Sequence, residues 1–446
     1  MFKHIKYLVL IFILCNCVLV LKASAATINA ASCSKAHVEA AISSASNGDT
    51  INIPSGIETW TGYVDVAKEL KLVGAGIDST IIRGYGFRIV PSTDNIEITG
   101  FTFDGDVSGP KKHAIYCGVK IYQNCGDNDG GTKRFRFHHN KFMEYLPTNW
   151  DSWWFCNAIN LKGFCYGVID NNQFVDCLAE TIYYAADNDE GWGRAEGLGG
   201  YENGTVFVED NTFTSTGSFK HYYLNVIDAN CGARYVFRYN TVEDHVDAGI
   251  ITVCECHGAC NNDTDNCEVR GTHSVEIYNN TIIKHSAQDP EIFKIRGGRG
   301  YIYGNRLYAE DNCFWGLSYQ IHLTEYRASP KTYSACYDCT SSGCSGPALN
   351  TYCPNNEGYP CKDQINKLYF YDNKKDVNQV AGAETWVDLA CFVNTNGEIP
   401  NYIVEGRDFF WNTQYPSYTA YAYPHPLRTK LGEDGPTAPT GLQVIK

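Results

Sequence analysis

The sequence predicts an all-β protein built as a parallel β-helix solenoid of about ten coils. Three observations lead to this prediction: a recurring strand-and-turn pattern, a second apolar strand before most copies of it, and a β-rich composition. Of the 446 residues, 44% are hydrophobic and only 19% are charged, while glycine (41 residues) and aromatic residues (13%) are abundant. This composition suits a β-rich extracellular protein and excludes a disordered chain.

The recurring pattern consists of alternating apolar residues, then Asn, then an apolar residue two positions later. Asn at such a turn tolerates a left-handed backbone and can bond to neighbouring backbone groups along a stack. Successive copies are separated by 32, 39, 29, 40, 25 and 68 residues, which is typical of a solenoid with insertions. The asparagines of the pattern are Asn140, Asn172, Asn211, Asn240, Asn280, Asn305 and Asn373.

A second apolar strand precedes most of these copies, and its period-2 alternation places one set of side chains inside and the other outside. Two strands and a turn in about 25 residues, stacked on copies of themselves, describe a parallel β-helix. Val, Ile, Phe and Tyr at the inward positions argue against a leucine-rich repeat of similar period. The second strands are expected at 158–162, 181–184, 222–227, 249–253 and 291–295.

The two ends of the repeat differ from its middle. Apolar residues at helical spacing over 38–45, followed by Asn47-Gly48, predict a short amphipathic helix. Such a helix would cap the first coil, whose open end would otherwise expose unpaired strand edges. Residues 415–446 contain several prolines and little periodicity, which indicates a linker or a docking strap. The first coils are expected to begin with strands at 50–53, 70–73, 80–82 and 96–98.

Residues 1–25 have the features of a secretory signal peptide. Lys3 and Lys6 precede an apolar stretch over 7–21, and an Ala-Ser-Ala cleavage motif ends at residue 25. The apolar stretch of about 15 residues is shorter than the ~20 that a membrane span needs, which disfavours the alternative of a retained anchor. We therefore expect a secreted or cell-surface monomer with no membrane span after signal removal, a β-helix domain over 26–414 and a tail over 415–446.

The net charge and the cysteine content narrow the class of protein further. The net charge of −14 argues against a nucleic-acid partner. Of 20 cysteines, two lie in the signal segment, and the remaining even number predicts disulfide bonds in an oxidising compartment. Zinc binding is the alternative for the second of two dense clusters. The clusters, expected in loop insertions, are Cys254, Cys256, Cys260 and Cys267, and Cys336, Cys339, Cys344, Cys353 and Cys361.

With these features the chain resembles the pectin lyase-like superfamily of right-handed parallel β-helices. The resemblance spans about residues 30–430, and it rests on segment 40–56, on Leu72-Val-Gly-Ala-Gly76, on the Asn-Asn-Thr turns and on Arg296-Gly-Gly-Arg-Gly300. A Tyr-Pro-His-Pro-Leu segment at 423–427 is similar to the end of secreted bacterial repeat proteins. The resemblance implies a right-handed coil. It leaves the activity open, because the superfamily contains lyases, hydrolases, isomerases and non-enzymatic surface proteins.

Charged residues at the ends of successive first strands predict a site on the solenoid wall. Asp187, Asp228 and Glu255 would bring carboxylates about 5 Å apart, and Ca²⁺ between them would relieve their repulsion. Bound Ca²⁺ would neutralise the carboxylate of a uronate unit and acidify the adjacent C–H, as β-elimination requires. The resemblance implies an Arg or Lys as the base, which assigns that role to Arg296 or Lys294 beside Asp228.

Other residues are expected to bind an extracellular polysaccharide. These substrate-binding candidates, in the wall or in loops that project from it, are Lys162, Trp153, Trp154, Trp192, His245 and Asp247. Two alternatives to a Ca²⁺-assisted lyase stay open: a non-enzymatic glycan-binding or surface protein, and a glycoside hydrolase. A hydrolase would need a carboxyl pair such as Asp187 with Asp228 or Asp228 with Asp247. It is disfavoured because the chain has no Asp-Asp pair and no Gly-His-Gly.

Overall fold

The structure is a computed structural model of the chain. It describes residues 25–91, 93–105, 113–117, 133–145, 157–177, 180–186, 204–216, 224–244, 251–256, 272–285, 292–295, 297–309, 321–323, 367–377, 380–381 and 405–430.

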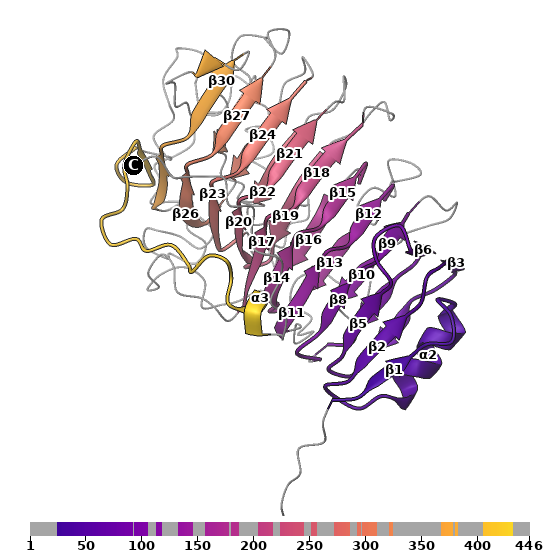
Figure 1. Cartoon of the computed structure of the whole chain (residues 1–446). Helices are drawn as coiled ribbons and strands as arrows, with labels where there is room; N and C mark the ends of the chain where they lie inside the picture. The colour runs from indigo at the N-terminus through magenta and orange to yellow at the C-terminus, as the bar shows by residue number, and fades with distance from the viewer. Residues whose placement is uncertain are drawn as a thin grey trace, which may run out of the picture.

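The described residues fold into three long β-sheets that wind around a single core (Figure 1). In each coil a strand of sheet A is followed by one of sheet B and then one of sheet C. Neighbouring strands pair in parallel, except for β30 and β31 at the end of sheet B. The predicted parallel β-helix is therefore confirmed. None of the helices in this part of the chain is long and apolar enough to cross a membrane.

The strands are short and repeat in the same order along the chain. Sheet A contains β1 (Thr27–Asn29), β2 (Thr50–Ile53), β5 (Lys71–Gly74), β8 (Glu97–Thr99), β11 (Lys133–His138), β14 (Tyr166–Asp170), β17 (Thr205–Glu209), β20 (Arg234–Arg238), β23 (Ser274–Tyr278), β26 (Arg299–Tyr303), β29 (Leu368–Tyr371) and β32 (Phe409–Trp411). Sheet B contains β3 (Gly56–Trp60), β6 (Thr80–Gly84), β9 (Thr102–Asp104), β12 (Lys141–Met143), β15 (Gln173–Val175), β18 (Thr212–Ser215), β21 (Thr241–Asp244), β24 (Thr281–Lys284), β27 (Arg306–Ala309), β30 (Lys374–Val377) and β31 (Val380–Ala381). Sheet C contains β4 (Val64–Val66), β7 (Phe87–Ile89), β10 (Ile115–Cys117), β13 (Ile159–Lys162), β16 (Glu180–Ala185), β19 (Leu224–Asn230), β22 (Ile251–Cys256), β25 (Phe293–Ile295) and β28 (Ile321–Leu323).

The core is made of stacked columns of like side chains. In sheet B the rings of Phe142, Phe174 and Phe213 stack with centroids 4.7 and 4.6 Å apart, and Val242 takes the same position in the next coil. Strand alternation directs these residues inward, and the register of the sheet repeats them at each coil. The apolar alternation in the sequence therefore specifies both the inner face and the stacking.

The turns from sheet A to sheet B form a ladder of asparagines, most of them fully buried. Asn211 shows the pattern: its Oδ1 accepts from the Asn172 backbone N–H at 2.9 Å, and its Nδ2 donates to the Ile169 carbonyl at 2.8 Å. Its own N–H donates to Asn240 in the next coil. The residue before each ladder asparagine, rather than the asparagine itself, has the left-handed backbone. These residues are His139, Asn171, Asp210, Tyr239, Asn279, Gly304 and Asp372.

Replacing Asn211 with Asp tests the ladder. Asp has the same shape and keeps the acceptor, but its second oxygen would face the Ile169 carbonyl where Nδ2 now donates. We expect the free energy of unfolding to fall by about 3 kcal/mol at pH 7, because an unpaired buried charge replaces a hydrogen-bonded amide, and by less at pH 4. Thermal unfolding of N211D would measure this. N412D, at an exposed turn, is the control and should differ from the parent by under about 0.5 kcal/mol.

The N-terminal helix α2 (Lys35–Ser44) lies beside the first coil (Figure 1). It buries Val38, Ala41 and Ile42, the residues whose spacing predicted it, and it contacts β2 and β4. The Lys68 ammonium donates to three carbonyls at the C-terminal end of the helix, which leaves fewer of its terminal acceptors unpaired.

The cysteine prediction is wrong for two residues. Cys254 and Cys256 lie in β22, fully buried and outside any disulfide, where they pair in register with Ile227 and Ala229. They belong to the coil, not to an insertion, because β22 continues through them and pairs with β19 on one side and β25 on the other. Cys231 is disulfide-bonded. The other cysteines of the two predicted clusters lie outside the described residues, so their pairing stays a prediction.

Residues 412–430 form a strap that runs back along the outer face of sheet A, from β32 to the short helix α3 (Leu427–Lys430) beside β11 (Figure 1). The strap covers a second apolar cluster on that face, which includes Phe207 and Tyr278. Tyr421 meets the Phe207 ring edge-on at 5.0 Å, and Tyr423 stacks on Tyr239 at 3.8 Å. Coils far apart in the sequence are thereby held by one segment.

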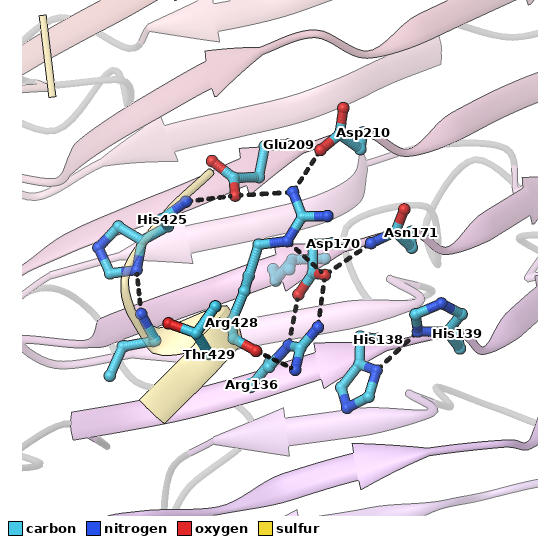
Figure 2. Close-up of polar contacts among 12 residues, drawn as sticks. Arg136, His138, His139, Asp170, Asn171, Glu209, Asp210, His425, Arg428 and Thr429 are labelled. Atoms are coloured by element: carbon cyan, nitrogen blue, oxygen red, sulfur yellow. Dashed lines mark hydrogen bonds and ion pairs between the residues drawn. The ribbon is translucent and has the colours of Figure 1, made fainter. Parts of the chain in front are cut away.

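Ion pairs fix the end of the strap (Figure 2). Arg428 lies between Asp170, at 3.2 Å, and Glu209, at 3.1 Å, and it also pairs with Asp210. Arg136 binds both oxygens of Asp170 and donates to the Arg428 carbonyl at 2.9 Å. Asp170 and Glu209 are fully buried, so their charges depend on these partners.

Strap docking should also depend on pH through Glu276. Burial raises the pKa of this carboxyl to about 7, although the Tyr418 hydroxyl of the strap donates to it at 2.6 Å and Arg238 is nearby. The carboxyl titrates near 4.5 when unfolded, so the stability gained from its protonated form is present below about pH 4.5 and is lost as pH rises through 7.

The variant E276Q stays neutral and can still accept from Tyr418. We expect it to match the parent near pH 4.5 and to be more stable by about 3 kcal/mol at pH 8, because 2.5 pKa units correspond to that energy. Unfolding temperatures measured across this range would test the expectation. Parallel pH curves for the two proteins would contradict it.

Candidate functional site

The insertions of the chain are concentrated around sheet C. From β8 to β30, each turn from sheet A to sheet B has two residues, as His139 and Asn140 between β11 and β12. Every longer connection in these coils leaves or enters the coil next to a strand of sheet C, such as those between β16 and β17 and between β22 and β23. Since binding residues are carried disproportionately by such loops, sheet C is the face on which to look for a site.

Sheet C presents a column of polar side chains. Its inward positions are apolar, as Ile159, Ile182 and Ile227 show. The residue after each of these points outward, and strand pairing places these residues in register at about 4.8 Å per coil. From β7 to β19 the column reads Arg88, Tyr116, Asn160, Tyr183 and Asp228, and the backbone register continues to Glu255 and Lys294.

The centre of the site is a pair of buried carboxyl groups. Glu180, at the start of β16, is 1% exposed, and Asp228 in β19 is 0% exposed. The two side chains are hydrogen-bonded to each other. Burial, followed by the charge of Asp228 and this hydrogen bond, raises the pKa of Glu180 well above its usual value. Two carboxyl groups this close cannot both be ionised cheaply, so a shared proton or a cation must lie between them.

Two asparagines fix the orientation of this pair. The Asn157 Nδ2 donates to the Glu180 backbone oxygen at 2.8 Å and to its Oε2 at 3.3 Å. The Asn160 Nδ2 donates to the Asn157 Oδ1 at 2.7 Å, so the acceptor end of Asn160 must face away from that bond. Among the described residues, neither the Asn160 Oδ1 nor the Glu180 Oε1 has a hydrogen-bond donor, although both atoms are buried. Such atoms call for a ligand or water.

Lys162 and Tyr183 lie beside the carboxyl pair. The Lys162 ammonium lies 4.3 Å from the centre of the Tyr183 ring, and its charge acts on Glu180 to lower that pKa. The Tyr183 hydroxyl accepts from the Asn230 side chain at 2.9 Å, so its own hydrogen remains available to a ligand. Burial and the neighbouring carboxyls raise the pKa of Tyr183, which keeps its proton at neutral pH.

The structure brings some of the predicted site residues together. Asp228 and Lys162 both lie at the site, and Glu255 and Lys294 follow Asp228 in register. The expected single column is wrong in one respect: Lys162 is in register with Ala185 and Asn230, two residues past the Asp228 position. The predicted residues that lie outside the described part of the chain are Asp187, Arg296, Trp153, Trp154, Trp192, His245 and Asp247.

Sequence reasoning missed Glu180, Asn157 and Asn160. Each lies at or next to a strand that the sequence predicted, but outward charges were sought only at strand ends. Aligning strand starts would have placed Glu180 opposite Asn225 in the next coil. Because Glu180 is paired with Asn225, its contact with Asp228 joins side chains three positions apart in the register of two neighbouring coils, and no sequence pattern predicts this.

Comparisons with known proteins give weak matches. No protein-family model and no curated protein matches the chain. Among solved structures, a thermostable pectate lyase, PL 47, is similar over 88% of both chains, with 11% sequence identity and a TM-score of 0.39. The catalytic domain of a GH87 alpha-1,3-glucanase in complex with nigerose is similar over 79% of this chain and 64% of that chain, with 12% identity and a TM-score of 0.28.

The contact between the Glu180 and Asp228 carboxyl groups should lower the stability of the folded protein. A neutral residue at position 180 should remove that cost. In E180Q the amide can donate permanently to Asp228, whereas Glu180 must take up a proton to do so. In chelator at pH 8 we expect E180Q to be more stable than the parent by about 2 kcal/mol, the worth of a hydrogen bond to a charged group. The difference should shrink at pH 5. Thermal unfolding would measure the difference in stability. The control is E39Q, which replaces an exposed side chain of helix α2 and should change the stability little.

Proposed function

We propose that the protein is a secreted polysaccharide lyase that cleaves an extracellular uronan by β-elimination on the outer face of sheet C. The observation that carries this proposal is the buried contact between Glu180 and Asp228, which is bordered by the Asn157 side chain and flanked by Lys162. A uronan supplies a carboxylate, which a cation bound between these two carboxyl groups would recognise. The β-elimination also needs a base and a hydrogen-bond donor, and sheet C offers candidates for both.

The donor set fits Ca²⁺. Two carboxyl groups and the Asn160 Oδ1 provide only oxygen atoms, which this hard cation prefers, and two of these atoms lack a donor in the described part of the chain. No group of three or more His, Cys, Asp or Glu side chains there is placed to hold a metal, so amide oxygens and substrate would complete the shell. Asp228 and Glu180 would hold the ion, with Glu255 and Asp187 as further proposed ligands. Bound Ca²⁺ would neutralise the substrate carboxylate and acidify the adjacent C–H.

Substrate binding, proton removal and hydrogen bonding to the leaving group are assigned to residues of the chain itself. Lys162 is placed to bind the uronate carboxylate. The base is Lys294, which is in the Asp228 column two coils on, or Arg296; in its deprotonated form it takes the proton from carbon adjacent to the carboxylate. The electron pair forms the C=C bond as the bond to the glycosidic oxygen breaks. Tyr183 keeps its proton and donates a hydrogen bond to that leaving oxygen.

One observation favours a second candidate, a glycoside hydrolase. Glu180 retains a proton beside an acidic neighbour, which is the state required of a general acid. However, the hydrolytic pair is separated by about 5–5.5 Å in retaining enzymes and by about 6.5–9.5 Å in inverting ones, whereas these carboxyl groups are hydrogen-bonded. The lyase therefore remains the better-supported proposal, and a non-enzymatic glycan-binding protein is the outcome if no bond is cleaved.

The experiment is an assay for unsaturated product on pectate, alginate and other uronans, with Ca²⁺ or with chelator. We expect activity that chelator abolishes and Ca²⁺ restores. D228N and K162A should each reduce kcat/KM by about a hundredfold or more, because each loses a charge at the reacting unit. K71A, whose lysine pairs with Glu97 on sheet A, is the matched control and should retain full activity.

Three outcomes decide between the candidates. Unsaturated ends support the lyase. New reducing ends without unsaturation would establish the hydrolase, and binding without any new ends would establish the non-enzymatic protein. Ca²⁺ should also raise the unfolding temperature of the parent but not that of D228N, which tests the cation independently of turnover.

A further inference from the structure

A cluster of aromatic residues lies on sheet C on the N-terminal side of the carboxyl pair. This Tyr–His cluster consists of Tyr63, Tyr85, His113 and Tyr116. The His113 ring stacks on Tyr116 with centroids 5.5 Å apart and lies nearly parallel to Tyr63 at 6.5 Å, and Tyr63 meets Tyr85 edge-on at 4.9 Å. Tyr63 and Tyr85 are half-buried at its rim, and His113 is 1% exposed at its base.

The tautomer of His113 is fixed by its surroundings. Its Nδ1 lies 3.2 Å from the Asn157 carbonyl oxygen, which only accepts, so Nδ1 must carry the hydrogen. Burial lowers the pKa of His113 to about 4, and the ring is therefore neutral. It follows that Nε2 is a lone-pair acceptor. This buried atom has no donor among the described residues, and it is therefore placed to accept from a hydroxyl group of a ligand.

Among the described residues, the cluster itself contains no charged side chain. Arg88, whose charge acts on Tyr63, binds both oxygens of Asp65 at 2.6 Å and is thereby neutralised. Lys162 acts on His113 only through space and lies over the Tyr183 ring. A uronate carboxylate would thus be desolvated here without a counter-charge, which is unfavourable. An uncharged sugar offers hydroxyl donors for Nε2 and apolar ring faces for the tyrosines.

The cluster is also in line with the proposed centre. Tyr116 is in register with Asn160, and Asn160 with Tyr183, so Tyr116 lies two coils, or about 10 Å, from the β16 coil that holds Glu180, and three coils from Asp228. Asn157 links the two places: its backbone carbonyl accepts a hydrogen bond from His113, and the Asn157 side chain donates one to Glu180. One linear polymer lying along sheet C would reach both.

We propose that the Tyr–His cluster is a binding subsite for an uncharged pyranoside unit, held by stacking on Tyr63 and by a hydroxyl that donates to His113 Nε2. The polymer recognised by sheet C would then carry neutral sugars two or more coils away from the unit that is cleaved. The inference rests on the proposed function for the identity of the polymer, but the binding of a neutral sugar can be measured without turnover.

The test uses the full chain in chelator, which should abolish the proposed lyase activity, and measures affinity for two sets of probes. The neutral set is cello-, manno-, xylo- and malto-oligosaccharides, and the acidic set is oligogalacturonate and oligomannuronate. We expect at least one neutral oligosaccharide to bind, and H113L or Y63A to weaken it about tenfold, the equivalent of one lost hydrogen bond or ring contact. H113Q, which keeps an acceptor, should recover part of the loss. K162A should weaken only the acidic set.

Three results would overturn the proposal. The first is that no neutral oligosaccharide binds the folded protein. The others are that H113L and Y63A leave the affinity for neutral oligosaccharides unchanged, or that these variants weaken the binding of the neutral and acidic sets equally. If H113L does not fold, Y63A at the half-buried rim decides the question. Failure of the proposed function is distinguishable, because neutral binding that depends on Tyr63 and His113 would persist in a protein that cleaves no uronan.

Discussion

The asparagine ladder is the constraint on which the rest of the structure depends. Each rung connects a side-chain amide to backbone groups of the preceding coil, so the turn between sheets A and B can neither lengthen nor shift by one residue without leaving buried polar groups unpaired. The two-residue turn therefore repeats in coils separated by 25 to 68 residues of sequence. A fixed corner on one side of the coil allows insertions of very different length on the other.

Because of this asymmetry, the contacts that stabilise the fold and the residues of the candidate site lie on different sheets. Sheets A and B hold the stacked phenylalanines, the ladder and the strap, while sheet C carries two buried carboxyl groups whose contact costs stability. In a solenoid each coil touches only its neighbours, so a costly coil would be a weak point in the stack. The strap offsets this weakness. Arg238 donates to the strap carbonyls of Tyr421 and Ala422, which ties the β20 coil to a segment anchored at β32 and β11.

The sequence was sufficient for the fold because the fold is repetitive. The apolar alternation and seven asparagines give the same information at each coil, and errors at one copy are corrected by the others. The site has no such redundancy. Asp228 and Lys162 were recognisable as outward charges, but their relative position depends on a register that differs by two residues from the expected one. Cys254 and Cys256 were misplaced for a related reason: polar neighbours suggested a loop, whereas strand β22 continues through both and pairs with β19 and β25.

Glu180 illustrates why the remaining part of the site was not predictable. Its partner is 48 residues away in the sequence, and the contact joins side chains three positions apart in the register of β16 and β19. Stacking places the outward side chains of successive coils in a linear series of environments, one for each coil. Along the sheet C column the outward residue changes from Arg88 through tyrosine and asparagine to Asp228 and Lys294. Because the coil spacing of about 4.8 Å is constant, a linear polymer aligned with the solenoid axis would meet these environments in a fixed order. If a polymer binds there as proposed, its recognition would depend on the order of outward residues along this one column.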